Sequence, residues 1–217
     1  MTSPISTAYP RVDELVAEVV GGYVSELQRG YLADRSGAVA TLAQLRRGAG
    51  KLLQDVPELW GVCGIERLYG EHGLRDGGPE HIRAKAENAL FLAMTLYALH
   101  QQSHTKERMH LPESELGAAV RRLMPANTIE EPIRRRFVRL GTATDLEALA
   151  YRLREIVSLL RREAIPLDYA LLAGQLYQAQ FPDGLRQVRR RWGRSFHAYR
   201  SQVSSPSGED ETKKDDQ

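Results

Sequence analysis

An uncharged segment in the middle of the chain, Asn88–Leu99, constrains the fold more than any other feature of the sequence. It covers about three helical turns, and its apolar side chains would point in every direction around a helix. A helix that is apolar on all sides must be surrounded by other elements. The segment is too short to cross a bilayer, which takes about 20 apolar residues. We therefore predict that residues 80–102 form the buried central helix of a soluble all-α protein.

The segments on both sides of this helix have the apolar spacing of amphipathic helices. No stretch alternates with a period of two beside a turn signal, so we predict no sheet and about eight helices. A kink is expected in the first helix, at Gly21 and Gly22. The covering helices are predicted at residues 12–27, 34–48, 55–68, 116–124, 128–141, 144–165, 168–176 and 183–199.

Several of these helices are preceded by start signals. A Ser or Thr followed three residues later by Glu forms a capping box, and Asp is a favoured N-cap because its carboxylate accepts from a free backbone N–H. The predicted signals are the boxes Thr128 with Glu131 and Thr144 with Glu147, and the caps Asp168 and Asp183.

Charge is distributed unevenly along the chain and suggests three parts. Residues 1–116 carry 12 basic and 15 acidic side chains, residues 117–203 carry 16 and 8, and residues 204–217 carry 2 and 5. We predict an N-terminal helical bundle at 1–124, a C-terminal Arg-rich bundle at 125–203, and a disordered acidic tail at 204–217.

All 16 basic residues of segment 117–203 are arginines. The planar guanidinium group binds phosphate through two parallel hydrogen bonds, which lysine cannot do. A GC-rich genome also favours Arg over Lys, so the preference by itself does not define a function.

The single cysteine, Cys63, excludes a disulfide framework, and no apolar leader opens the chain. Cys63 lies beside Val62 and Ile65, and we interpret it as a small core residue rather than a nucleophile. We expect a cytoplasmic protein that makes no membrane contact.

Three histidines, His100, His104 and His110, have the spacing of a zinc-protease helix. That chemistry needs a glutamate base directly after the first histidine and a glycine where the helix turns toward the third ligand. The chain has Gln101 and Glu107 at those positions. A metal-dependent hydrolase built on these histidines is therefore a weak alternative.

Other enzyme motifs are incomplete or absent. Residues 48–51 have part of a phosphate-binding loop, but the first glycine is missing and Leu52 stands where Ser or Thr should hold magnesium. There is no G-x-S-x-G and no C-x-x-C. We predict a protein that is not an enzyme and that has no catalytic residue, no metal and no cofactor.

The remaining functional signal is a set of arginines on three consecutive predicted helices. If they converge on one face, they would bind nucleic acid through phosphates, independently of base sequence. Arg189–Arg191 cannot all contact one strand, because three consecutive residues span most of a helix circumference. A helical protein–protein scaffold, with the arginines paired to acidic partners, is the alternative that stays open.

Several segments, taken in order, resemble a known family. It is the CasB family of small subunits of the type I-E CRISPR surveillance complex called Cascade. The resemblance runs from about Ser36 to Tyr199, and it rests on the order and spacing of its segments. These segments are 38–48, 89–102, 116–123, Arg135–Phe137, 149–160, Ile165–Tyr169 and Arg190–Phe196.

The resemblance implies a non-catalytic, all-helical protein of two packed bundles, present in several copies. It would contact the subunits that hold the guide RNA, and would stabilise target DNA and the R-loop during antiviral defence. The implied phosphate contacts are Arg46, Arg47, Arg121, Arg122, Arg135, Arg136, Arg190 and Arg194. Charge and helical spacing add Arg139, Arg154, Arg161 and Arg162.

Overall fold

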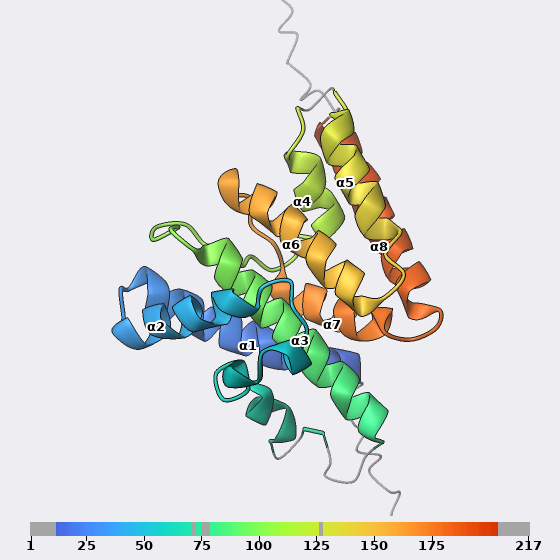
Figure 1. The fold of residues 1–217 in the computed structure, drawn as a ribbon. Coiled ribbons are helices and arrows are strands. Elements are labelled where there is room, and N and C mark those ends of the chain that lie inside the picture. Colours follow the sequence, from blue (N-terminus) through green and yellow to red (C-terminus); the bar gives the residue numbers. More distant parts are fainter. Residues whose placement is uncertain (1–11, 71–72, 75–78, 126–127, 204–217) are drawn as a thin grey trace, which may run out of the picture.

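The computed structural model describes residues 12–70, 73–74, 79–125 and 128–203, with side chains up to residue 199 (Figure 1). The predicted disordered tail at 204–217 lies outside the described residues, and so does most of the loop 70–79. The described part of the chain is helical and contains no strand, which confirms the all-α prediction. Its helices are α1 Val12–Leu32, α2 Ser36–Leu45, α3 Glu80–Gln101, α4 Leu116–Arg122, α5 Glu131–Gly141, α6 Leu146–Arg162, α7 Tyr169–Ala179 and α8 Gly184–Val203.

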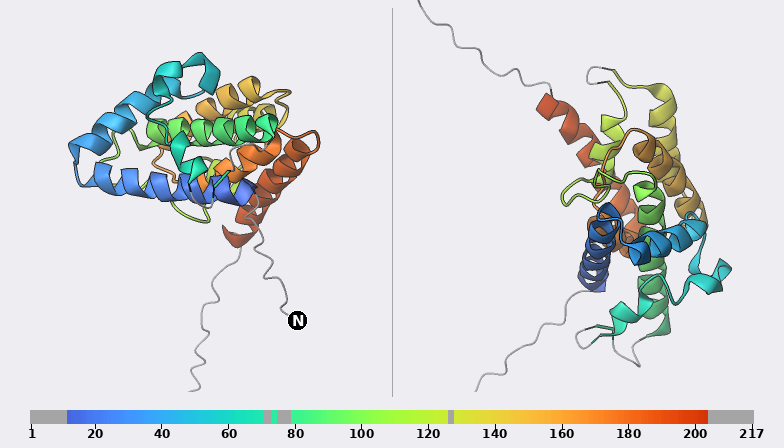
Figure 2. Two further views of the ribbon diagram at one scale, coloured as in Figure 1. Left: turned by 90° about the horizontal axis from the view of Figure 1, so that it is seen from below. Right: turned by 90° about the vertical axis from the view of Figure 1, so that its left-hand side faces the viewer.

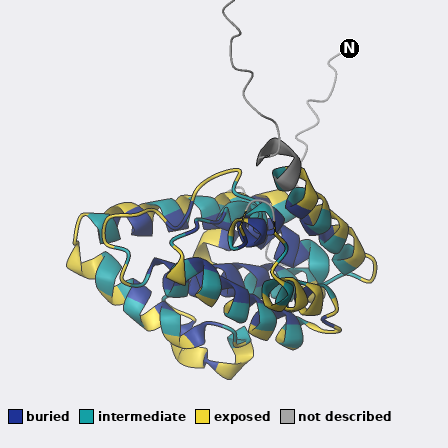
Figure 3. Cartoon of the chain, turned by 90° about the horizontal axis from the view of Figure 1, so that it is seen from above, coloured by how far each residue is buried: buried dark blue, intermediate teal, exposed yellow. Residues whose placement is uncertain are grey.

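Helix α3 is the centre of the molecule, as predicted. Every residue from Ala89 to Ala98 is at most 1 % exposed. It packs against α1, α2, α6 and α7, and in the left view of Figure 2 it lies between α1 and α6. Figure 3 shows buried residues gathered toward the middle and exposed residues on the outer faces of the peripheral helices.

Two glycines allow α1 and α7 to lie close together. A Cβ atom at Gly21 would lie 3.0 Å from Cβ of Ala170, and one at Gly174 would lie 3.0 Å from the backbone oxygen of Asp13. α1 is continuous through Gly21 and Gly22, where a kink was expected. The glycine at position 21 therefore serves close helix packing rather than a break in the helix.

The predicted helix at 55–68 is wrong. This segment forms short 3₁₀ turns, η3 Pro57–Leu59 and η4 Ile65–Tyr69, after η2 Leu53–Asp55. Gly64 has a left-handed conformation with φ of 86°, which a continuous right-handed helix cannot contain. Val56 before Pro57 has φ of −142° and ψ of 62°, outside the right-handed helical region that a residue before a proline avoids.

Aspartates rather than threonines cap α6 and α7. The carboxylate of Asp168 accepts from the backbone N–H of Leu171 at 3.0 Å, which confirms the predicted cap of α7. At α6 the cap is Asp145, which accepts from the N–H of Ala148 at 2.8 Å. The hydroxyl of Thr144 donates to Asp145 instead of capping the helix, so the predicted box is wrong.

The box predicted at Thr128 is also wrong. α5 begins one residue after Glu130, which makes no side-chain cap hydrogen bond, and Pro132 lies in its first turn. Before α8, the carboxylate of Asp183 pairs with Arg186.

Helices from both sides of residue 124 contribute to one hydrophobic core, in which α3 packs against α6 and α7, and α1 packs against α7. The boundary between bundles at 124 and 125 stays a prediction. In the described part of the chain, no helix is both long enough and apolar enough to span a bilayer.

Candidate nucleic-acid interface

Helix α8 separates a buried apolar face from a charged one. Val188, Trp192 and Phe196 recur at four-residue spacing and are 1 %, 2 % and 6 % exposed. The indole N–H of Trp192 donates to the Oε1 atom of Gln175 on α7 at 2.6 Å, which fixes the rotation of α8 against the core. The opposite faces of α8 therefore present arginines to solvent: Arg186, Arg190, Arg191 and Arg194 are all exposed.

Helix α4 lies against α8 at backbone distance. A Cβ atom at Gly117 would lie 1.9 Å from the backbone oxygen of Trp192 and 2.7 Å from the nitrogen of Phe196. Glycine is the only residue type that fits such an approach. This contact brings the C-terminal end of α4, with exposed Arg122, next to the charged side of α8.

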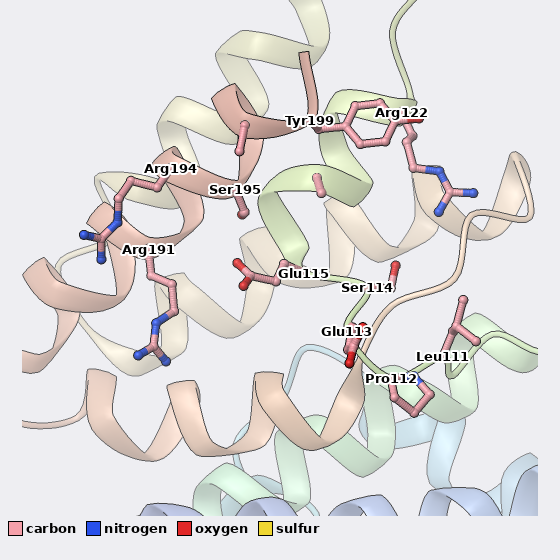
Figure 4. Close-up of a pocket in the computed structure, with 12 residues that line it drawn as sticks. Leu111, Pro112, Glu113, Ser114, Glu115, Arg122, Arg191, Arg194, Ser195 and Tyr199 are labelled. Carbon is pink, nitrogen blue, oxygen red and sulfur yellow. The ribbon is translucent and has the colours of Figure 1, made fainter. Parts of the chain in front are cut away.

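A groove of about 670 Å³ runs between α8, α4 and the loop before α4; we call it the mixed groove. Figure 4 shows Arg191 and Arg194 extending from α8 on one side and Arg122 on the other. Glu113 and Glu115 also line it. The mixed groove thus presents guanidinium groups at its edges and carboxylates between them.

A second groove of about 340 Å³, the basic groove, shares Arg191 and Arg194 with the first. Its remaining lining residues are Gln178, Gln187, Val188 and Arg190. None of the residues that line it is acidic. The amide of Gln178 already donates to the carboxylate of Asp13 at 2.6 Å. Three guanidinium groups around one hollow form a site that selects anions.

Arg191 belongs to both grooves but was not among the predicted contacts. Its neighbour Arg189 faces the other way and donates to the backbone oxygen of Ala143. The run Arg189–Arg191 therefore divides as helix geometry requires, with two members at the grooves and one within the fold. The three consecutive arginines in the sequence were the signal that could have identified Arg191.

The arginines of α5 lie near their own carboxylate. Glu131 accepts from Arg134 at 2.8 Å and lies 3.4 Å from Arg135. The hydrogen bond from Arg134 lowers the pKa of Glu131, with Arg135 adding to the effect. Arg135 and Arg139 are exposed and Arg136 is half-buried. Stacked rings of Phe137 and Phe196, 5.3 Å apart, join α5 to α8.

A second basic region lies around the turn η1 Arg46–Gly48. Arg47 is exposed and Arg46 is half-buried. Exposed Arg154 on α6 lies over the next turn, because a Cβ at Gly50 would be 2.7 Å from Cδ of Arg154. Arg154 therefore lies against the segment that directly follows Arg46 and Arg47 in the chain. Arg162, at the end of α6, pairs with Glu163 at 2.9 Å.

The prediction for Arg121 is wrong. This side chain is 1 % exposed and donates to the backbone oxygens of Met124 and Pro125, at 3.3 and 2.9 Å. It satisfies carbonyls that the end of α4 leaves free, so it cannot reach an external phosphate.

Arg161 is half-buried and also has a structural contact. Its Nε donates to the backbone oxygen of Gln102 at 3.1 Å and joins the ends of α6 and α3. Neither the resemblance, which implied Arg121, nor helical spacing, which added Arg161, could distinguish these two arginines from exposed ones.

The three histidines make hydrogen-bond contacts with different groups. His100 Nδ1 lies 2.9 Å from the hydroxyl of Tyr169, and His110 Nδ1 accepts from the backbone N–H of Tyr169 at 3.2 Å. His104 Nε2 lies 2.8 Å from the backbone oxygen of Arg161. Burial lowers the pKa of His100 to about 3. Among the described residues, no group of three His, Cys, Asp or Glu side chains is arranged to hold a metal.

Cys63 is fully buried, as predicted. Burial raises the pKa of its thiol to about 11, so the thiol stays protonated near neutral pH.

Comparison with known proteins identifies the family. Residues 41–197 match the CRISPR-associated protein Cse2 family (CRISPR_cse2). The chain belongs to this family. It is 52 % identical to the protein in "Crystal structure of CasB from Thermobifida fusca", with a TM-score of 0.76 over 84 % of this chain and 98 % of that one. The resemblance to CasB-type small subunits is therefore confirmed.

A second solved structure, titled "CRISPR RNA-guided surveillance complex", contains a chain with the same fold. Identity is 18 % and the TM-score is 0.63, over 88 % of this chain and 97 % of that one. No curated protein sequence matches this Cse2-family chain.

Proposed function

We propose that this Cse2-family chain is a non-catalytic small subunit of a CRISPR RNA-guided surveillance complex, in which it binds nucleic acid during antiviral defence in the cytoplasm. The observation that carries this proposal is the gathering of Arg190, Arg191 and Arg194 around the basic groove, with Arg122 across the mixed groove. Its partners are the other subunits of the complex, further copies of itself, target DNA and the guide RNA backbone.

Phosphate binding explains how such a surface acts without a reactive centre. Each guanidinium that contacts a phosphate releases a condensed counterion, and this supplies affinity that does not depend on base sequence. In RNA-guided recognition the guide pairs with the target and reads its sequence, while protein holds backbone and shape. A basic surface beside the opened duplex would stabilise the R-loop in this way.

We rank the proposed contacts by their place in the grooves and by the carboxylates near them. Arg122, Arg190, Arg191 and Arg194 come first, because they line the two grooves. The second basic region, Arg46, Arg47 and Arg154, is a separate contact area. The α5 arginines Arg135, Arg136 and Arg139, and Arg162 on α6, are secondary because carboxylates lie close to some of them.

The test is a charge reversal at the basic groove. The double variant Arg190→Glu, Arg194→Glu should bind single- and double-stranded DNA at least about tenfold more weakly, and the slope of log affinity against log salt should fall by about 2. Fluorescence anisotropy over a salt series measures both quantities. The loss should be equal for unrelated DNA sequences, since phosphates and not bases are contacted.

A matched control distinguishes a local site from a general charge effect. Arg29→Glu, Arg35→Glu changes the net charge by the same amount, with both residues exposed and outside the proposed site. Equal weakening by the two double variants would contradict the proposal.

One observation favours a protein-contact role in addition. Val138 on α5 and Tyr151 on α6 are large apolar side chains that are 49 % and 57 % exposed. Exposed apolar groups on neighbouring helices suit a subunit contact. Val138→Ser, Tyr151→Ser should reduce recovery of the chain with its native complex and leave the DNA affinity of the isolated chain unchanged. If this double variant lost DNA binding instead, the apolar surface and the basic groove could not be separate contact areas.

A further inference from the structure

We infer that the acidic segment 204–217 docks into the basic groove of its own chain and competes there with nucleic acid. This inference rests on the proposed function, since it assigns a regulator to the same arginines. It has three supports, which are the chemistry of the groove, the charge of the segment, and the place where the segment leaves the fold.

The basic groove is built to hold an anion and contains none of its own. Arg190, Arg191 and Arg194 are exposed, and within the described residues no ion pair joins any of them to a carboxylate. Arg186, one turn earlier, already pairs with Asp183. The carboxylates closest to this hollow are Asp13, which accepts from the amide of Gln178 at 2.6 Å, and Glu115 of the mixed groove. No described ion pair joins either of them to the three groove arginines, so the guanidinium groups repel one another.

The segment 204–217 carries complementary charge in a compact block. Glu209, Asp210 and Glu211 are consecutive, and the segment has no apolar residue that would direct it into a core. Three adjacent carboxylates resemble a short stretch of phosphodiester backbone in charge. Guanidinium groups that hold phosphates hold carboxylates with the same two-bond geometry.

The block can reach the groove. α8 ends at Val203, and at a rise of 1.5 Å per residue Arg194 and Arg190 lie about 13 and 20 Å back along the helix. Seven residues of extended chain, from Val203 to Asp210, span up to about 23 Å. The carboxylates therefore lie within tether distance of all three arginines, at an effective concentration on the order of millimolar.

The predicted consequence is weaker binding of nucleic acid to the basic groove. Nucleic acid must displace the acidic block before it can bind in the groove. The free chain therefore binds phosphates less tightly than it would if the block were absent. A strand held in place by guide pairing would displace the block, whereas a random strand at low concentration would not. The docked segment thus suppresses unspecific binding outside the complex.

The first experiment contains no nucleic acid and uses the full chain. Ser207→Cys supplies a site for a nitroxide label, while buried Cys63 stays unlabelled. Docking should broaden the Nε–Hε NMR signals of Arg190 and Arg194 at low salt, assigned with Arg→Lys variants. The broadening should disappear in about 1 M salt, where the Debye length is about 3 Å. It should also disappear when Glu209→Gln, Asp210→Asn and Glu211→Gln are introduced together.

A matched control is Lys213→Gln, Lys214→Gln, which alters the same segment but keeps the acidic block and should preserve or increase the broadening. Absence of broadening in the labelled wild type, or equal broadening in the neutralised variant, would overturn the inference.

The second experiment measures competition by DNA anisotropy at low salt. The neutralised variant should bind about two- to tenfold tighter than the wild type, and the lysine control should not. Equal affinities of the neutralised variant and the wild type would overturn the inference even where broadening is seen. If no variant binds DNA at all, the proposed function fails, while the NMR result still decides whether the segment docks.

Discussion

Helices α3 and α8 have similar lengths, 22 and 20 residues, and opposite roles. α3 contacts other helices on all sides and carries no charge between residues 88 and 99. α8 attaches through one apolar stripe and carries arginines on the rest of its surface. The difference shows that this fold keeps stability and charge in separate helices. Changes to the groove arginines should therefore alter binding without unfolding the protein, whereas changes where α8 meets the interior should do both.

The largest expected effect is at the contact between α4 and α8, where one substitution should change both stability and binding. Gly117→Ala places a Cβ 1.9 Å from the backbone oxygen of Trp192, so the two helices must move apart. We expect the free energy of unfolding to fall by more than about 3 kcal/mol, measured by urea denaturation. DNA affinity should fall as well, because α8 and Arg122 would lose their alignment.

Gly193→Ala is the control for this change. It lies in α8, and no atom would come within 4 Å of its Cβ. Alanine in an open helical position should stabilise the protein by about 0.5–1 kcal/mol. Similar destabilisation by both variants would show that helix α8, rather than its contact with α4, is sensitive.

The next test compares adjacent arginines of α4. Arg121→Met removes hydrogen bonds from a buried guanidinium to two backbone oxygens, and should cost about 2–3 kcal/mol of stability. Arg122→Met should change stability by less than about 0.5 kcal/mol but weaken DNA binding, because Arg122 is exposed at the mixed groove. Reversed outcomes would contradict the assignment of Arg121 to the fold and Arg122 to the surface.

The smallest expected effect concerns the polar interior beside α3. His100 has a folded-state pKa of about 3 because it is buried, whereas an unfolded histidine titrates near 6.5. Between these values the unfolded chain binds a proton that the folded chain does not, so stability falls as the pH drops below about 6.5. Between pH 6.5 and 5 the loss should be roughly 2 kcal/mol. His110, whose pKa burial also lowers, acts in the same direction.

Urea denaturation at pH 7.5, 6 and 5 measures this loss, and His100→Gln should flatten the dependence. At pH 5 and above most carboxylates remain ionised, so their titration contributes little. An unchanged pH dependence in the variant would exclude His100 as its source.

Much of the fold could be predicted because hydrophobic periodicity determines which faces become buried. The uncharged run 88–99 marked the central helix, and the cap at Asp168 was found from its position. The helix predicted at 55–68 failed because the left-handed turn at Gly64 is a local conformation that apolar spacing does not report. The box at Thr144 failed because the aspartate one residue later is the better acceptor, and the box at Thr128 failed because α5 begins two residues later than expected.

The site was less predictable because it depends on how helices pack. Helical spacing identified α8 as charged, but only the approach at Gly117 brings Arg122 to the same groove as Arg194. The family resemblance placed Arg121 among the phosphate contacts, and a resemblance cannot report that neighbouring carbonyls draw this side chain inward. Composition thus indicates a basic surface, and packing decides which arginines belong to it.

The burial of α3 has a consequence for synthesis on the ribosome. α6 and α7, two of the helices that enclose it, end at residues 162 and 179, long after α3 has left the exit tunnel. Until then a nascent chain exposes the apolar surface of Leu90, Leu92 and Leu96, which invites aggregation or chaperone binding. Truncated chains that stop before α7 should accordingly be recovered in inclusion bodies.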